Sequence, residues 1–180
     1  MREYKMFSKP KDVELWVNSN YTESELKRLS VSNNIDTPLA DYKGGGYRLM
    51  NGYLRIHEED KQNDFDIQGL QEFLLSKTIG EPIVVFRFVD IKELGMLWWN
   101  TRFGKTFKYS AFLSTTMLKD HYSMENIRKN RFLITINVPQ GTNGTYLPEV
   151  NSKMPEYEIL LPYHTKLKRI GFMTFEVEGA

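Results

Sequence analysis

Two carboxylates are the first candidates for chemistry in this chain. Glu156 and Glu158 lie in EYEILLP, directly before the apolar run Ile159–Leu161. On a β-strand, residues two apart face the same way, roughly 6.5–7 Å apart along the chain. A carboxylate pair can stabilise an oxocarbenium-like centre and move a proton, as glycosidases do. The alternative is that both are solvated residues near the start of a strand.

An arginine inside an apolar segment is the second candidate. Arg87 interrupts PIVVFRF, whose β-branched and aromatic residues are typical of a buried strand. A guanidinium is costly there unless it meets an anion. The anion could be a phosphate group of a ligand or a neighbouring carboxylate of the chain, and an arginine at a strand end could instead reach water.

Hydroxyls end the next predicted strand, FLSTT. Strand alternation puts Ser114 and Thr116 on one face and Thr115 on the other. No Gly-x-Ser-x-Gly turn surrounds Ser114, so we do not interpret it as a nucleophile. A hydroxyl here could hold a catalytic carboxylate, although such clusters are also common at strand ends.

The segment YRLMNGYLR carries a polar stripe. Arg48, Asn51 and Arg55 are spaced by three and four residues, which aligns them on a helix that begins near Tyr47. Two arginines and an amide on one face could clamp a diphosphate. An ordinary solvated face is the alternative.

The order of elements predicts an α+β fold. Val13, Trp16 and Val17 are spaced for one face of a helix, and TESE (residues 22–25) is a capping box for the next. Three consecutive glycines at 44–46 indicate a loop. Strand patterns dominate after residue 80, so we expect one domain over residues 1–180, helical to about residue 80 and sheet-rich from about 81.

Composition excludes several classes of protein. The chain of 180 residues has a net charge of +1 and no cysteine, which rules out thiol nucleophiles and thiolate zinc sites. The balanced charge gives no reason to expect nucleic acid, and no apolar run is long enough for a membrane span. The histidines show no metal-ligand spacing, so no metal is expected; they are His57, His121 and His164.

Taken in order, the motifs resemble the Arg–Ser–Glu class of mono-ADP-ribosyltransferases, the clostridial-type exoenzymes and the catalytic halves of binary toxins. Arg87, the hydroxyls after FL, and Glu-x-Glu running into ILLP carry the resemblance, which covers about residues 40 to 178. It extends to YRLMNGYLR, GKTFKYSAFLSTT and RFLITINVPQGTNGTYLPEV. The resemblance implies N-terminal helices packed on two roughly perpendicular, mainly antiparallel sheets that form an NAD cleft.

The resemblance also implies catalytic roles. Glu158 would bind the ribose 2′-hydroxyl and stabilise the charge that grows as nicotinamide leaves, with Ser114 hydrogen-bonded to it. Glu156 would orient and deprotonate an acceptor arginine, since a carboxylate pairs well with a guanidinium. Lys153 and Met154 lie where many members place an aromatic residue that touches the protein substrate, so the familiar targets, actin and Rho-type GTPases, are not assumed.

NAD contacts follow from the same resemblance. Arg131 stands at the position of a family arginine, with Arg128 as the alternative, and Tyr122 is the candidate aromatic. The full set expected to contact NAD is Arg87, Arg55, Asn51, Arg48, Arg131, Tyr122, Thr115 and Thr116.

The expected function is NAD-dependent mono-ADP-ribosylation of a protein arginine, with NAD as substrate and no metal. We expect a toxin or effector, exported or delivered into a target cell without an N-terminal signal in this chain, and a translocation or immunity partner is compatible with that role. Three alternatives stay open: an NAD glycohydrolase that uses water, a non-catalytic module that binds NAD or a partner, and a glycosidase. A glycosidase would not explain Arg87 or the arginine stripe, because neutral sugars carry no phosphate.

Overall fold

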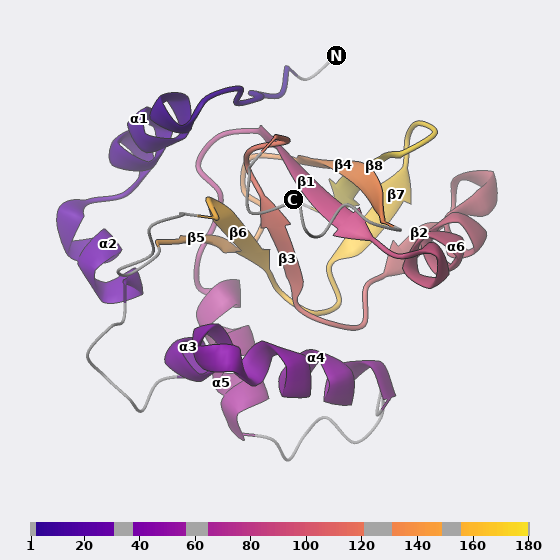
Figure 1. Cartoon of the computed structure of the whole chain (residues 1–180), viewed down its shortest axis with the longest axis horizontal. Coiled ribbons are helices and arrows are strands. Elements are labelled where there is room, and N and C mark those ends of the chain that lie inside the picture. Colours follow the sequence, from indigo (N-terminus) through magenta and orange to yellow (C-terminus); the bar gives the residue numbers. More distant parts are fainter. Residues whose placement is uncertain (1–2, 31–37, 57–64, 121–130, 149–155, 180) are drawn as a thin grey trace.

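The computed structural model describes residues 3–30, 38–56, 65–120, 131–148 and 156–179 (Figure 1). Helices come first. They are α1 (Pro10–Asn20), α2 (Glu23–Leu29), α3 (Pro38–Asp41), the π-helical turn η1 (Tyr42–Gly46), α4 (Tyr47–Ile56) and α5 (Phe65–Leu75). The later segments that are helical are α6 (Ile91–Asn100) and the short 3₁₀ turn η3 (Arg102–Gly104).

Eight strands form the sheet-rich part. They are β1 (Ile83–Val89), β2 (Thr106–Lys108), β3 (Leu113–Thr116), β4 (Phe132–Val138), β5 (Thr145–Leu147), β6 (Glu158–Leu161), β7 (Lys166–Arg169) and β8 (Thr174–Glu178). Their order is β2-β7-β8-β4-β1-β3-β6-β5, and every pair is antiparallel except β4 with β8. The α+β class and the mainly antiparallel pairing are therefore confirmed.

The junction between β1 and β3 is the narrowest point of this sheet. β1 pairs with β4 along seven registered positions, but with β3 only at Phe86 and Thr116. The two sheets implied by the resemblance are thus connected into one hydrogen-bonded array at this junction. Figure 1 shows α3, α4 and α5 as a layer beside the β3–β6 end, with α6 beside β2.

Local sequence signals explain the first helices. In α1, Val13, Trp16 and Val17 are all buried, as their spacing predicts. Thr22 and Glu25 form both reciprocal bonds of the capping box that starts α2, which confirms that prediction. α4 begins at Tyr47, as expected, and its Met50 and Leu54 enter the core.

The prediction of a loop at the three glycines is wrong. Tyr42–Gly46 forms a π-helical turn that joins α3 to α4. Gly45 has φ +113°, a left-handed value that permits the kink between the two helices. A Cβ on Gly46 would lie 2.6 Å from the Asp41 carbonyl oxygen, so the chain needs glycine to close the turn.

Candidate active site

The β3–β6 ladder positions the candidate catalytic residues. Ser114 lies opposite Leu160 and Thr116 lies opposite Glu158. Opposite residues of an antiparallel pair share a face, so Ser114 and Glu158 lie on the same face of adjacent strands. Glu158 also pairs with Leu147 of β5, which places its backbone inside the sheet, and its side chain is half-buried.

The strand geometry expected for the two glutamates is corrected by the structure. β6 begins at Glu158, so Glu156 lies before the strand and is exposed. Between them Tyr157 has φ +48°, a left-handed value that interrupts the alternation of a strand. Regular strand spacing therefore does not set the relation between the two carboxylates.

Two threonine hydroxyls hold the start of β6. Thr116 Oγ1 donates to the Glu156 carbonyl oxygen at 2.8 Å, and Thr115 Oγ1 donates to the Ile159 carbonyl oxygen at 2.8 Å. Both threonine side chains are buried. Sequence reasoning expected these residues at NAD; in this structure their hydroxyls fix the backbone that carries Glu156 and Glu158.

Arg87 is held by three partners. Its Nε donates to Glu93 Oε1 at 3.0 Å, Nη1 donates to the Ser114 carbonyl oxygen at 2.7 Å, and Nη2 donates to the Tyr109 hydroxyl at 3.1 Å. The Tyr109 hydroxyl in turn donates to Glu93 Oε1 at 2.5 Å. Glu93 is thus the neighbouring carboxylate that the sequence analysis considered as a partner of Arg87. These bonds use three of the five guanidinium N–H groups.

The register alone would not bring Arg87 towards Glu158. Phe86, not Arg87, lies opposite Thr116, and alternation in a regular sheet turns neighbouring residues to opposite faces. The bonds to Glu93, Tyr109 and the Ser114 carbonyl fix the guanidinium instead.

Tyr42 lies within electrostatic reach of both charged groups. Its side chain is buried, and burial together with the charge of Glu158 raises the pKa of its phenol, while Arg87 opposes the rise. For Arg87, desolvation lowers the pKa, but Tyr109 and Glu93 outweigh it and hold the pKa above the ordinary value. The guanidinium is therefore a permanent cation near Tyr42.

α4 contributes two residues of the predicted stripe. Asn51 is buried; its Oδ1 accepts from the Phe112 backbone N at 3.0 Å and its Nδ2 donates to the Tyr42 hydroxyl at 3.4 Å. Arg55 Nη2 donates to the Tyr109 hydroxyl at 3.5 Å. Asn51 thus ties α4 to the segment that leads into β3, and Arg55 adds a second cation beside Arg87.

The other predicted residues are less closely connected to this cluster. Arg48 is exposed and its Nε donates to the Tyr47 hydroxyl at 3.0 Å, and Arg131 is exposed directly before β4. Tyr122, Arg128, Lys153 and Met154 lie outside the described residues. Within the described residues, no group of three or more His, Cys, Asp or Glu side chains could hold a metal ion.

Sequence reasoning missed three residues of the cluster. Glu93, Tyr109 and Tyr42 come from α6, the segment before β3, and η1. Only Glu93 carries a local signal, because Asp90 caps α6 through the Glu93 backbone N. That signal marks a helix start and says nothing about the pairing of its carboxylate with Arg87.

The arrangement suits an anionic ligand. Arg87 and Arg55 meet at the Tyr109 hydroxyl, and among the described contacts only Glu93 opposes them. Two guanidinium groups against one carboxylate leave a net positive charge, which favours a phosphate or diphosphate.

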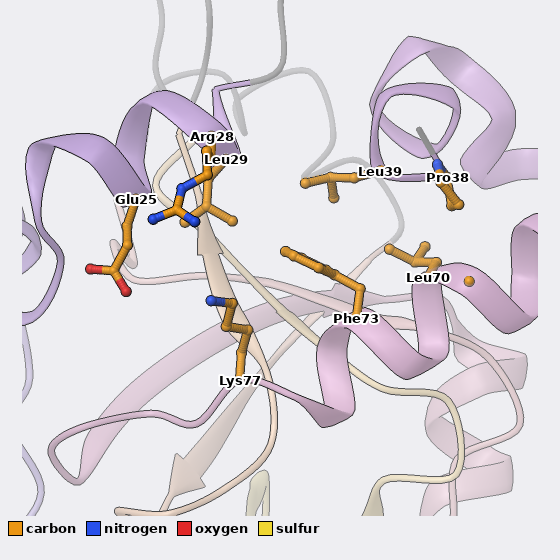
Figure 2. A pocket seen from close by; sticks show the side chains of 9 residues that line it. Glu25, Arg28, Leu29, Pro38, Leu39, Leu70, Phe73 and Lys77 are labelled. Atoms are coloured by element: carbon orange, nitrogen blue, oxygen red, sulfur yellow. The ribbon is translucent and has the colours of Figure 1, made fainter. Parts of the chain in front are cut away.

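A separate apolar cavity of about 300 Å³ lies between α2, α3 and α5 (Figure 2). Leu29, Leu39, Leu70 and Phe73 form its apolar walls, and Arg28 and Lys77 lie at one end. It contains none of the residues expected to contact NAD. Its apolar walls do not suit a diphosphate, which needs polar contacts. We therefore interpret it as a gap in the packing between helices.

Comparison with known proteins places this chain among toxins. The family model described as ADP-ribosyltransferase exoenzyme matches residues 13–178. A search of curated proteins gave no match.

Solved structures share the fold at low sequence identity. Plx2a, an ADP-ribosyltransferase toxin from Paenibacillus larvae, is 17% identical, with a TM-score of 0.68 over 99% of this chain and all of that chain. C3stau2 from S. aureus, solved with NAD, is 14% identical, with a TM-score of 0.67 over 99% of this chain and 100% of that chain. BECa, of a binary enterotoxin of C. perfringens, was solved with NADH; it is 19% identical, with a TM-score of 0.70 over 98% of this chain but half of its own.

Proposed function

Because the chain belongs to the ADP-ribosyltransferase exoenzyme family, with NAD as the substrate, we propose that it transfers ADP-ribose to an arginine side chain of a protein and releases nicotinamide. The observation that best supports this proposal is the setting of the two glutamates. Glu158 is half-buried inside the sheet on the face of Ser114, whereas Glu156 is exposed and reachable by an acceptor.

The proposed reaction breaks the bond between ribose C1′ and the nicotinamide nitrogen, and the bonding electrons leave with nicotinamide. Glu158 binds the ribose 2′-hydroxyl and stabilises the positive charge that develops on the ribose. A nitrogen of the acceptor guanidinium then bonds to C1′, and Glu156 takes the proton that this nitrogen loses. Ser114 holds Glu158 through a hydrogen bond.

The proposed NAD contacts centre on the cationic cluster. Arg87 and Arg55 bind the diphosphate, supported by Asn51, which fixes α4. Arg48, Arg131 and Tyr122 complete the proposed set by family resemblance, and Lys153 and Met154 face the protein substrate.

Hydrolysis of NAD is the second candidate activity. The exposure of Glu156 favours it, because water can reach the position that an acceptor arginine would otherwise occupy. We also propose that the chain is a single catalytic domain. As a member of a toxin family, the protein would be secreted or delivered into a target cell, and a translocation or immunity partner would accompany it.

The acceptor is tested by mass spectrometry with small mimics. The protein is incubated with NAD and either agmatine, which carries a guanidinium, or an asparagine peptide, which carries an amide. ADP-ribosyl-agmatine without a modified asparagine peptide supports the proposal. Modification of the asparagine peptide instead would exclude arginine specificity, and free ADP-ribose alone would identify a glycohydrolase.

A further inference from the structure

Large aromatic side chains stand exposed at the β2 edge of the sheet. Trp99 at the end of α6 is 66% exposed, Phe103 in η3 is 90% exposed, and Phe172 in the β7–β8 hairpin is 76% exposed. Single exposed apolar residues are ordinary, but a group of rings on neighbouring elements marks an interaction site. In Figure 1, α6 lies beside β2 and β7.

Contacts of two rings of α6 tie this helix to the β7–β8 hairpin through Trp98 and to η3 through Trp99. The Trp98 and Phe172 rings meet edge to face at 4.9 Å between centroids. The Arg102 guanidinium stacks over Trp99 at 3.6 Å, and Arg169 lies over Trp98 at 5.6 Å. We call this surface the aromatic face; it comprises Trp98, Trp99, Arg102, Phe103, Arg169 and Phe172.

The backbone holds Phe103 outwards at a conformational cost. Its φ is +57°, in the left-handed region that bulky residues rarely adopt. Such outliers cluster at ligand-binding and other functional sites, so a strained and exposed ring marks this turn as a candidate contact.

Basic residues are concentrated in the two segments that carry the aromatic face. Residues 98–108 contain Arg102, Lys105 and Lys108, and residues 166–173 contain Lys166, Lys168 and Arg169, with no Asp or Glu in either segment. β2 and β7 pair directly, with Lys108 opposite Lys166, so the two basic segments lie side by side. Alternation along β7 turns Lys166 and Lys168 to the side of the sheet opposite to Arg169, so Arg102 and Arg169 are the cations that contact the rings.

Acidic groups from the neighbouring strand offset only part of this charge. Glu178 of β8 contacts Lys168 at 4.0 Å and lies opposite Lys166. Within the described part of the chain, Arg102, Lys105, Lys108 and Arg169 have no ion pair. The chain as a whole carries only +1, so this excess of positive charge is local.

We propose that the aromatic face docks on the surface of an anionic phospholipid bilayer. Tryptophan and phenylalanine gain by entering the headgroup region, and nearby Lys and Arg are attracted to anionic lipids. The rings come from a helix end, a turn and a hairpin, and their high exposure suits insertion into a fluid surface. Within the described residues no helix is long and apolar enough to cross a membrane, so attachment by this face is peripheral.

This attachment leaves the proposed NAD cluster accessible. Glu93, which pairs with Arg87, lies in the first turn of α6, whereas Trp99 lies near its end. Six residues of helix separate the two by roughly 9 Å along the axis. Lipid binding and nicotinamide release can therefore be measured independently.

The test is co-sedimentation of the full chain with vesicles of phosphatidylcholine alone and of phosphatidylcholine mixed with phosphatidylserine. We expect binding to the mixed vesicles only, weakened by salt, with a blue shift of tryptophan emission as Trp99 enters the headgroup region. Arg102→Gln and Arg169→Gln each lower the partition coefficient about fivefold. Phe103→Ser combined with Phe172→Ser lowers it further at low salt and leaves nicotinamide release unchanged.

Leu49→Ser is the matched control, because Leu49 is 80% exposed on α4, outside the aromatic face. The proposal is overturned if the mixed vesicles do not bind the protein, or if Leu49→Ser weakens binding as much as the phenylalanine changes. The proposal is also overturned if the protein binds poly-L-glutamate more tightly than vesicles and Phe103→Ser leaves that binding unchanged. That result would indicate an acidic protein partner instead.

Discussion

Glu156 and Glu158 occupy different environments although one residue separates them. Glu158 starts β6 and is half-buried, and its charge adds to the effect of burial in raising the pKa of the Tyr42 phenol. Glu156 is exposed before the strand, with its carbonyl oxygen held by Thr116. The left-handed Tyr157 between them separates the two carboxylates by backbone geometry. This difference is the physical basis for assigning one to the donor sugar and the other to the acceptor.

Glu156→Gln tests that assignment. The amide cannot take a proton from the acceptor guanidinium, so transfer to agmatine should fall by about 100-fold or more. Hydrolysis of NAD should change by less than about threefold, because Glu158 remains in place. Both rates come from one chromatographic assay of nicotinamide and ADP-ribosyl-agmatine. An equal fall in the two rates would contradict the division of roles.

Arg87→Lys tests the cationic clamp. Lysine keeps the charge but cannot reproduce the three directed bonds to Glu93, Tyr109 and the Ser114 carbonyl oxygen. KM for NAD should rise about tenfold or more, since the displaced cation loses roughly one charge-assisted bond to the diphosphate. Thermal unfolding of the variant without ligand shows whether the fold is intact.

Arg48→Lys is the matched control for Arg87→Lys. Arg48 is exposed and bonds only to the neighbouring Tyr47 among the described residues, so the same chemical change should shift KM for NAD less. A larger rise in KM for Arg48→Lys than for Arg87→Lys would move the diphosphate away from the cluster at Tyr109.

At the residue scale, the sequence indicated which side chains could do chemistry but not which residues they would contact. The apolar strand around Arg87 predicts that its guanidinium meets an anion, because burial demands one. It does not identify Glu93, which comes from the next helix and is placed by how α6 packs beside β1. Tyr42 and Tyr109 are aromatic residues like many others in the sequence until folding brings them to a charged group.

Among the elements, the start of β6 depends most on side-chain hydroxyls. Thr116 donates to the Glu156 carbonyl oxygen and also accepts from the Leu118 backbone N at 3.3 Å. Met117 N donates to the Tyr157 carbonyl oxygen at 3.0 Å, which adds a backbone tie. These bonds hold the left-handed turn that presents both glutamates.

Thr116→Val should loosen that turn. The variant keeps the shape of the buried side chain but loses both bonds, at a cost of about 1–3 kcal/mol in the free energy of unfolding. We expect kcat for transfer to fall about tenfold with a smaller change in KM for NAD. Thr116→Ser keeps the hydroxyl and should recover most of kcat. Equal kcat values for the valine and serine variants would exclude a positioning role.

Elements with local signals were predictable, and those that depend on pairing were not. The capping box of α2 and the spacing in α1 are properties of short segments, so their helices follow from sequence. The π-helical turn at Gly45 and the left-handed Tyr157 serve contacts with distant segments. Neither conformation is the usual choice for its sequence, and only the tertiary structure shows it.

For the whole molecule, the sheet order joins distant segments. β1 contacts β3 and β4, and β6 lies between β3 and β5, so strand pairing brings Ser114 and Glu158 to adjacent strands. Arg87 joins them through its bond to the Ser114 carbonyl oxygen. The sequence predicted the α+β class from the order of helices and strands. The family resemblance implied two mainly antiparallel sheets, but no strand order was predicted, because periodicity shows which residues are buried and not which strands pair.

Buried tyrosines predict how stability depends on pH. Burial raises the phenol pKa of Tyr21, Tyr42 and Tyr109 above the ordinary 10.0. Their contribution is complete below about pH 10; above it the unfolded chain loses protons that the folded chain retains, so the free energy of unfolding falls. Denaturant titrations at rising pH measure this fall.

Tyr42→Phe identifies one contributor to that fall. The variant should lower the slope of the unfolding free energy above pH 10 by about 1.4 kcal/mol per pH unit. Leu39→Val, at a buried residue that does not ionise, serves as the control for a general loss of stability. An unchanged slope in Tyr42→Phe would show that its phenol ionises equally in both states.

Glu158 carries the central claim, and release of nicotinamide from labelled NAD by Glu158→Gln tests it most directly. The glutamine variant keeps size and hydrogen-bonding capacity but loses the negative charge that would stabilise the ribose cation. We predict that release falls by about 1,000-fold or more, with NAD binding retained. Release at the wild-type rate from a folded variant would contradict the account, because the bond would then break without the carboxylate placed opposite Thr116.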